Sequence, residues 1–132
     1  MNLLLDTNTL IWSAMDVGKL SDTARKSIVD CGNSIHVSVI SFLEISLKYA
    51  TGRLELNGVL PDDFPGIATE MGFAIQELSP ETVSAFYLLP KAGHKDPFDR
   101  LIAWEAIQSG MALVTRDMGF ASYAKNGLRV LW

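Results

Sequence analysis

Hydrophobic residues along this chain gather in short runs that alternate with longer segments of mixed polarity. The first run, Leu3 to Leu5, is unbroken and stops at an aspartate, which is typical of a strand buried on both faces of a sheet. Comparable apolar and β-branched runs predict four more strands, over about residues 34–38, 73–76, 111–115 and 128–131. We therefore expect a sheet of about five strands.

The segments between these strands carry apolar residues at helical spacing and residues that favour helix boundaries. Ser21, Ser79 and Asp96 stand where N-caps are expected, and the last two directly precede a proline, which suits the first helical position. The pattern predicts helices over about residues 7–16, 22–30, 41–50, 62–71, 79–89 and 96–109. Loops are expected over 53–61 and 90–94, and a loop or short helical turn after Gly119.

Strands and helices alternate along the whole chain, which predicts a mainly parallel sheet with helices on both faces. The 132 residues suit one domain, and neither a linker nor a repeat divides them. The predicted fold is thus a three-layer α/β/α sandwich formed by a single domain over residues 1–132.

Composition narrows the class of protein. The chain is 48% hydrophobic, which allows a packed core, and its one cysteine, Cys31, cannot form an internal disulfide. Neither a secretory signal nor an apolar stretch of membrane-spanning length is visible in the sequence. We expect a cytoplasmic protein without a membrane segment.

Asp6 and Asp117 each follow a predicted strand, at the edge of the sheet where open α/β folds bind ligands. Both positions have a plainer explanation. Asp6 could be simply the N-cap of the next helix, and Asp117 could be simply a turn residue. Their position alone leaves these alternatives open.

Glu44 lies three residues after Ser41, which is the spacing of a capping box at a helix start. However, its neighbours Phe42, Leu43 and Ile45 are apolar, so the side chain is expected to face protein. The preceding strand ends close before it, which would bring Glu44 to the same sheet edge as Asp6.

Asp96 and Asp99 flank the start of the last long helix. Asp96 is the natural N-cap, and Asp99 falls in the first turn, where the helix dipole favours an anion. Asp99 also shares a helical face with apolar Ile102 and Ala103, which should face the sheet. We therefore favour Asp99 as a site residue and regard Asp96 as a cap or an outer contact.

Together these acids predict a metal site. Asp6, Glu44, Asp99 and Asp117 should meet at one edge of the sheet, where four carboxylates repel each other unless a cation joins them. Oxygen ligands suit Mg²⁺ or Mn²⁺. The formal net charge of -4 argues against a static nucleic-acid binder, but without these four acids the 11 basic residues are balanced. A nucleic-acid substrate therefore stays possible.

These segments resemble the PIN-domain family, and in particular the PIN ribonuclease toxins of bacterial type II toxin–antitoxin pairs. The resemblance covers essentially the whole chain and rests on Leu5-Asp6-Thr7-Asn8, Ser41 with Glu44-Ile45, Asp96-Pro97-Phe98-Asp99-Arg100-Leu101-Ile102-Ala103, Val114-Thr115-Arg116-Asp117 and the ending Val130-Leu131-Trp132. It implies a metal-dependent endoribonuclease that uses Mg²⁺ or Mn²⁺, forms a homodimer and is inhibited by a cognate antitoxin. By position, Asp6, Glu44, Asp99 and Asp117 match the family's catalytic and metal-binding acids.

Several other residues are candidates for supporting or substrate contacts. Six lie beside the acids: Asn8, Ser41, Asp96, Arg100, Thr115 and Arg116. Lys91, His94 and Lys95 could also attract an RNA backbone, although a solvated loop explains them equally well. Trp12, Trp104 and Trp132 could stack on bases, but packing is the simpler expectation.

Two other classes of function remain as alternatives. One is a non-catalytic RNA-binding or scaffold module on the same fold, which would tolerate loss of the acids that this chain carries. The other is a haloacid-dehalogenase-like phosphatase or a receiver domain. The phosphatase pattern requires an aspartate where Asn8 stands, and a receiver domain requires a lysine after the last strand.

Overall fold

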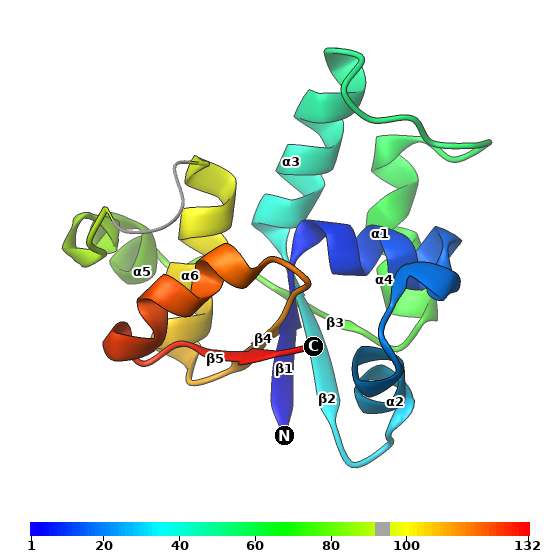
Figure 1. Ribbon diagram of the computed structural model, residues 1–132. Helices are drawn as coiled ribbons and strands as arrows, with labels where there is room; N and C mark the ends of the chain where they lie inside the picture. Colours follow the sequence, from blue (N-terminus) through cyan, green and yellow to red (C-terminus); the bar gives the residue numbers. More distant parts are fainter. Residues whose placement is uncertain (92–95) are drawn as a thin grey trace.

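The computed structural model describes residues 1–91 and 96–132, and a five-stranded sheet forms its middle layer. The strands are β1 (Asn2–Leu5), β2 (Ser34–Ser38), β3 (Ala74–Gln76), β4 (Ala112–Val114) and β5 (Arg129–Leu131), in the spatial order β3-β2-β1-β4-β5. All four neighbouring pairs are parallel. The predicted sheet is confirmed, with the first strand of the sequence at its centre (Figure 1).

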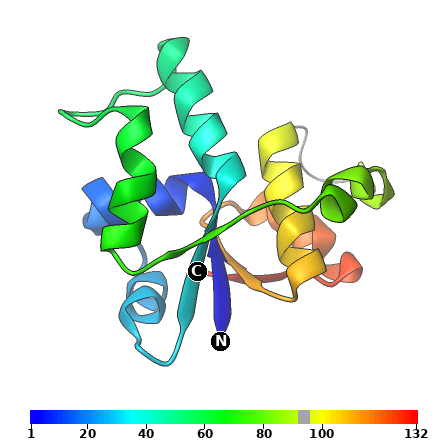
Figure 2. The same cartoon turned by 180° about the vertical axis from the view of Figure 1, so that it is seen from behind.

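Helices cover both faces of this sheet, as Figures 1 and 2 show from opposite sides. One face carries α1 (Thr7–Met15), α2 (Asp22–Val29) and α4 (Phe64–Glu70), and the other carries α5 (Pro80–Ser84) and α6 (Pro97–Ser109). Helix α3 (Val39–Ala50) rises from the end of β2. The described ranges also contain four 3-10 segments: η1 (Val17–Lys19), η2 (Pro61–Asp63), η3 (Phe86–Leu88) and η4 (Met118–Asn126).

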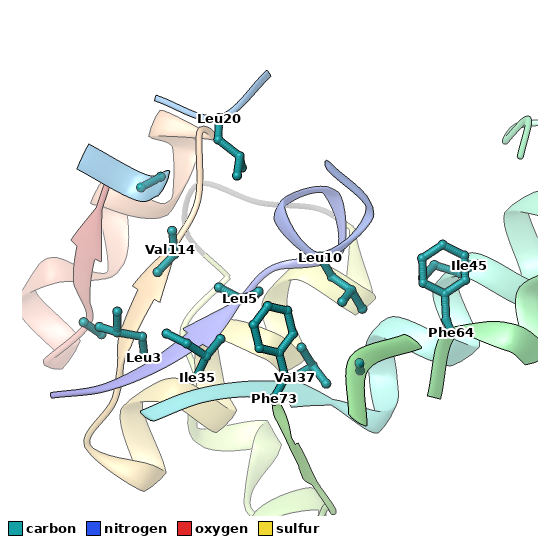
Figure 3. Packing of buried hydrophobic residues seen from close by; sticks show 13 residues of the cluster. Leu3, Leu5, Leu10, Leu20, Ile35, Val37, Ile45, Phe64, Phe73 and Val114 are labelled. Carbon is teal, nitrogen blue, oxygen red and sulfur yellow. The ribbon is translucent and has the colours of Figure 1, made fainter. Parts of the chain in front are cut away.

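The two faces of the sheet form two separate hydrophobic clusters. Because neighbouring residues of a strand point to opposite faces, Leu3 and Leu5 pack with Ile35, Val37 and the helices on one side (Figure 3). Leu4 packs on the other side, with residues of α6 and η4. All three leucines have 0% exposure, which explains why the strand is a continuous apolar run.

Two helix boundaries differ from the prediction. Helix α3 begins at Val39, because the hydroxyl of Ser38 caps it by accepting a hydrogen bond from the Ile40 N–H at 3.1 Å. The helix predicted over 79–89 is broken at Ala85 into α5 and η3. None of the helices in the described ranges is long and apolar enough to span a membrane.

The order of the strands reverses direction beside β1. From β1 the chain first adds β2 and β3 on one side, and later adds β4 and β5 on the other. The carboxyl ends of β1 and β4 therefore flank a topological switch point, which is where ligands bind in open α/β sheets.

Candidate active site

Asp6 stands at this switch point, directly after β1. It caps α1, because its Oδ1 accepts a hydrogen bond from the Thr9 N–H at 2.8 Å, while its Oδ2 accepts one from the Thr115 hydroxyl. Burial raises the pKa of the Asp6 carboxyl and the charge of Glu44 raises it further, while the bonds from Thr115 and Thr9 act in the opposite direction. Asp6 is thus both a helix cap and a buried carboxylate beside a second acid.

Glu44 is buried in the second turn of α3, with 3% of the residue exposed. The Thr7 hydroxyl donates a hydrogen bond to Oε1 at 2.6 Å, and the ammonium of Lys48 forms an ion pair with Oε2. The Ser41 hydroxyl lies 3.1 Å from that of Thr7. The side chain therefore faces the protein interior, as its apolar neighbours indicated.

The capping-box explanation of Glu44 is wrong. Since Ser38 is the N-cap of α3, Ser41 lies inside the first turn and Glu44 lies beyond it. Glu44 consequently has no role in starting the helix.

Asp96 caps α6, and its Oδ1 accepts a hydrogen bond from the Phe98 N–H at 2.8 Å. Asp99 follows in the first turn of the same helix. Burial raises the pKa of Asp99 to about 7, and the charges of Asp96, Glu44 and Asp6 contribute to the rise. Lys48 acts in the opposite direction. The predicted cap is confirmed, and both acids are half-buried.

Three of these carboxylates form a compact group. One oxygen from each of Glu44, Asp96 and Asp99 lies within 4.8 Å of the others, which is close enough for one metal ion to bridge them. The group joins α3 to the start of α6, two helices that pack against each other. Asp96, which the sequence suggested only as a cap or outer contact, is therefore a member of the group.

Asp117 is connected to Asp6 but is not part of this compact group. It is exposed and caps η4, where its Oδ1 accepts a hydrogen bond from the Gly119 N–H at 2.8 Å. Its own N–H donates to the Thr115 hydroxyl at 3.0 Å, the same hydroxyl that donates to Asp6. Asp117 is linked to the cluster through this threonine and lies outside the group of three carboxylates.

A cavity of about 330 Å³ is lined by Asp6, Asn8, Trp12, Arg116, Asp117 and Met118. A second cavity of about 490 Å³ is lined by Leu47, Lys48, Thr51, Arg53, Asp96, Pro97 and Phe98. Acids of the candidate site thus line both cavities, and each cavity contains an aromatic ring and at least one cation.

The other predicted residues have different environments. Thr115 and Ser41 are buried and contact Asp6 and Thr7 respectively, whereas Asn8 and Arg116 are exposed in the smaller cavity. The Arg100 guanidinium donates to the Leu89 carbonyl at 3.1 Å and lies over the Phe86 ring, contacts that hold it against η3. His94 and Lys95 lie outside the described residues.

Sequence analysis missed Lys48. Its ammonium contacts Glu44 and is influenced by Asp96 and Asp99, so it lies among the acids of the group. A signal was present, because Lys48 follows Glu44 by four residues, which places both on one helical face. That spacing is common on solvent-exposed helices, where it indicates a surface ion pair. Only the position of α6 shows that Lys48 lies among the acids of the candidate site.

The donor set fits a small divalent cation. Carboxylate oxygens are the ligands that Mg²⁺ and Mn²⁺ prefer, and three of them come within 4.8 Å of one another in the described part of the chain. Burial is the main cause of the raised pKa of Asp99, and the negative charges of Asp96, Glu44 and Asp6 add to it, as expected where carboxylates gather. Glu44, Asp96 and Asp99, with Asp6 beside them, could thus hold such an ion.

The chain is similar to known proteins in both sequence and fold. The chain is 26% identical to "Ribonuclease VapC22" of Mycobacterium tuberculosis over 92% of this chain and 91% of that protein. Its fold is similar to that of VapBC2 from Rickettsia felis, solved bound to a promoter DNA fragment, with a TM-score of 0.68 and 19% identity over 98% and 97% of the two chains. A toxin–antitoxin complex from Klebsiella pneumoniae matches with a TM-score of 0.56 and 19% identity, over 92% and 90%.

A match to a protein-family model identifies the family of this chain. Residues 3–126 match the model of the PIN domain, a range that runs from the central strand through η4 and includes all five acids described above. This chain belongs to the PIN-domain family.

Proposed function

We propose that this protein is a metal-dependent endoribonuclease toxin that a cognate antitoxin neutralises. The observation that carries the proposal is the group formed by Glu44, Asp96 and Asp99 next to Asp6, at the switch point of the sheet. The relatives support it, since one is named a ribonuclease and another is a toxin–antitoxin complex.

In this proposal Asp6 and Asp99 are the main ligands of Mg²⁺ or Mn²⁺, and Glu44 and Asp96 complete the set. A bound divalent ion would neutralise charge on the phosphodiester and favour ionisation of an attacking water. Asp117, which is exposed and lines the same cavity as Asp6, is suited to orienting that water.

Hydroxyl groups hold the carboxylates in place. Thr7 fixes one oxygen of Glu44, and Thr115 fixes one oxygen of Asp6. The Thr9 hydroxyl donates to the Val114 carbonyl at 3.0 Å, which joins the start of α1 to the end of β4. These bonds fix the geometry before any ligand binds, so less ordering is required when it does.

RNA cleavage in vitro tests the proposal. Purified protein should cut RNA with Mg²⁺ or Mn²⁺ and stop when EDTA is added. Asp6→Asn and Asp99→Asn should each lower the rate by about 100-fold or more, because each removes a charged ligand. Asp22→Asn, at an exposed position in α2, is the matched control and should keep full activity.

Cleavage that survives both chelation and the two substitutions would contradict a metal mechanism. Absence of cleavage on every RNA pool would favour the non-catalytic RNA-binding module instead.

The partners follow from the same proposal. We expect a cytoplasmic homodimer that is neutralised by the product of an adjacent small gene. Co-expression of that gene should relieve growth inhibition by this chain, and the two proteins should purify together.

A further inference from the structure

The smaller cavity contains chemistry that a metal site does not need. Of its six lining residues, Trp12, Arg116 and Met118 offer an indole, a guanidinium and a thioether. Its volume of about 330 Å³ is at the lower end of the ~300–1,000 Å³ that is usual for small-ligand sites. The hollow suits one planar group of nucleotide size rather than a long segment of chain.

Trp12 is held in a defined orientation at one side of this cavity. Its ring meets that of Trp132 edge-on, with centroids 6.1 Å apart and an interplanar angle of 63°. The residue is half-buried, so part of it stays accessible although it packs against the core. The Trp12 ring is therefore held in place by its neighbours but is not fully buried.

Two cations surround the same indole. The Arg116 guanidinium carbon and the Lys19 ammonium each lie 6.0 Å from the ring centroid. Lys19 also faces Asp16 at 3.5 Å, whereas Arg116 is exposed and lines the cavity. An aromatic face combined with cations is the usual composition of sites for single-stranded nucleic acid, because bases stack on the ring and phosphates pair with the cations.

The position of the cavity connects it to the acids. Asp6 lines it, and Asp6 also lies within electrostatic reach of Glu44 and Asp99. A phosphodiester drawn to a divalent ion at these carboxylates would therefore have its adjoining nucleotide close to the cavity. Met118, with 72% of its surface exposed, can adapt its unbranched side chain to different bases.

We propose that this cavity is a subsite in which Trp12 stacks on the base next to the cleaved phosphate, while Arg116 binds the adjoining backbone of single-stranded RNA. The inference rests on the proposed ribonuclease function and adds the position of one nucleotide to it. Stacking does not depend on base identity, so the subsite would supply affinity with little sequence preference.

Indole fluorescence tests the subsite directly. Titration with a short single-stranded oligouridylate, in buffer containing Ca²⁺ in place of Mg²⁺, should quench part of the tryptophan emission. Trp12→Phe should abolish the quenching, whereas Trp104→Phe should preserve it, because Trp104 is buried and its Nε1 donates to the Thr82 carbonyl at 2.8 Å. Thermal unfolding of both variants checks that they are folded.

Affinity measurements give a second test. Arg116→Gln should weaken RNA binding several-fold and reduce the slope of log affinity against log salt by about one unit. Trp12→Leu should weaken binding by about 5- to 100-fold. Arg25→Gln, on exposed α2, is the control and should leave the affinity unchanged.

The outcomes separate this proposal from the ribonuclease function. Normal cleavage together with unchanged binding by Trp12→Leu and Arg116→Gln would overturn only the subsite. Quenching that Trp12→Phe abolishes, in a protein that cuts no RNA, would support the subsite and contradict the nuclease. A protein that neither cuts nor binds RNA would overturn both.

Discussion

Lys48 gives the acidic group an internal counter-charge. Its ammonium pairs with Glu44, whose side chain is only 4% exposed, and the negative charges of Glu44, Asp96 and Asp99 stabilise its protonated form. Burial acts on the Lys48 pKa in the opposite direction, but the pKa is still raised overall. Lys48 therefore partly neutralises the acidic group in the absence of a metal ion. A metal ion that binds would share Glu44 with it.

We predict that Lys48→Met has two opposite effects. The metal-free protein should lose roughly 1–2 kcal/mol of unfolding free energy, because the buried Glu44 carboxylate loses its ion-pair partner, and the loss is limited because the lysine is partly exposed. The affinity for Mg²⁺ or Mn²⁺ should rise several-fold, because the ion no longer competes with an ammonium. Urea denaturation and calorimetric titration with Mn²⁺ measure the two effects.

Lys26→Met is the matched control, since Lys26 is exposed in the last turn of α2. It should change neither quantity. If metal affinity falls in Lys48→Met as well as stability, Lys48 assists metal binding and the competition is contradicted.

Among the single elements, helix α6 begins with a residue that is both an N-cap and a negative charge. Asp96 satisfies the Phe98 N–H of the helix and at the same time raises the pKa of Asp99. Two substitutions separate these roles. Asparagine keeps an oxygen that can cap but removes the charge, whereas alanine removes both.

Asp96→Ala should therefore be less stable than Asp96→Asn by about 1 kcal/mol, the usual contribution of an N-cap. Both should bind Mg²⁺ more weakly than the unaltered protein if Asp96 contributes its charge to the ion. Urea denaturation and calorimetry provide both measurements, and Ser79→Ala, which removes the cap of α5, is a reference for a cap without a metal role. Equal stability of the two Asp96 variants would mean that the cap contributes nothing.

The elements were largely predictable from local patterns. Strand β2 matches its predicted range, and the caps at Ser21, Ser79 and Asp96 are confirmed, because capping depends on residues within one turn. The start of α3 was misplaced because Ser38 and Ser41 both resemble caps, and only the end of β2 decides between them.

The site was less predictable because it depends on how elements pack. The positions of these acids in the sequence predicted that Asp6, Glu44 and Asp99 lie at one edge of the sheet. They could not predict the distances between the carboxylates. The packing of α3 against α6 brings Asp96 and Lys48 together with Glu44 and Asp99, whereas Asp117, the cap of η4, lies outside the group. The ligand roles of these acids remain predictions.

At the level of the whole molecule, Glu105 should lower the stability as pH rises toward neutrality. Glu105 is 1% exposed beneath the sheet, and burial raises its pKa to about 7, opposed by the Ser38 hydroxyl. Because its ordinary pKa is 4.5, the folded state binds more protons than the unfolded state between these values. The stability that protonated Glu105 provides is therefore fully present below about pH 4.5 and is lost as pH rises through about 7.

Glu105→Gln should remove this dependence while preserving the shape of the side chain. Its unfolding free energy should exceed that of the unaltered protein by an amount that grows with pH, by on the order of 2–3 kcal/mol in total across the window. Urea denaturation at pH values from about 5 to about 8, in EDTA, would measure it. Glu70→Gln, at an exposed position in α4, should follow the unaltered protein. If the difference in unfolding free energy between Glu105→Gln and the unaltered protein stayed constant with pH, Glu105 would not titrate in this range.

The central place of β1 has a consequence for synthesis of the chain. Asp6 is made early, but the Thr115 hydroxyl that holds it comes 109 residues later, and β4, which pairs with one side of β1, is made only shortly before. An emerging chain therefore carries its acids dispersed and its first strand paired on at most one edge until α6 and β4 have left the ribosome. Contacts of such long sequence separation form late and slowly. The candidate site is therefore assembled only after β4 and Thr115 have been synthesised and can pack against β1 and Asp6.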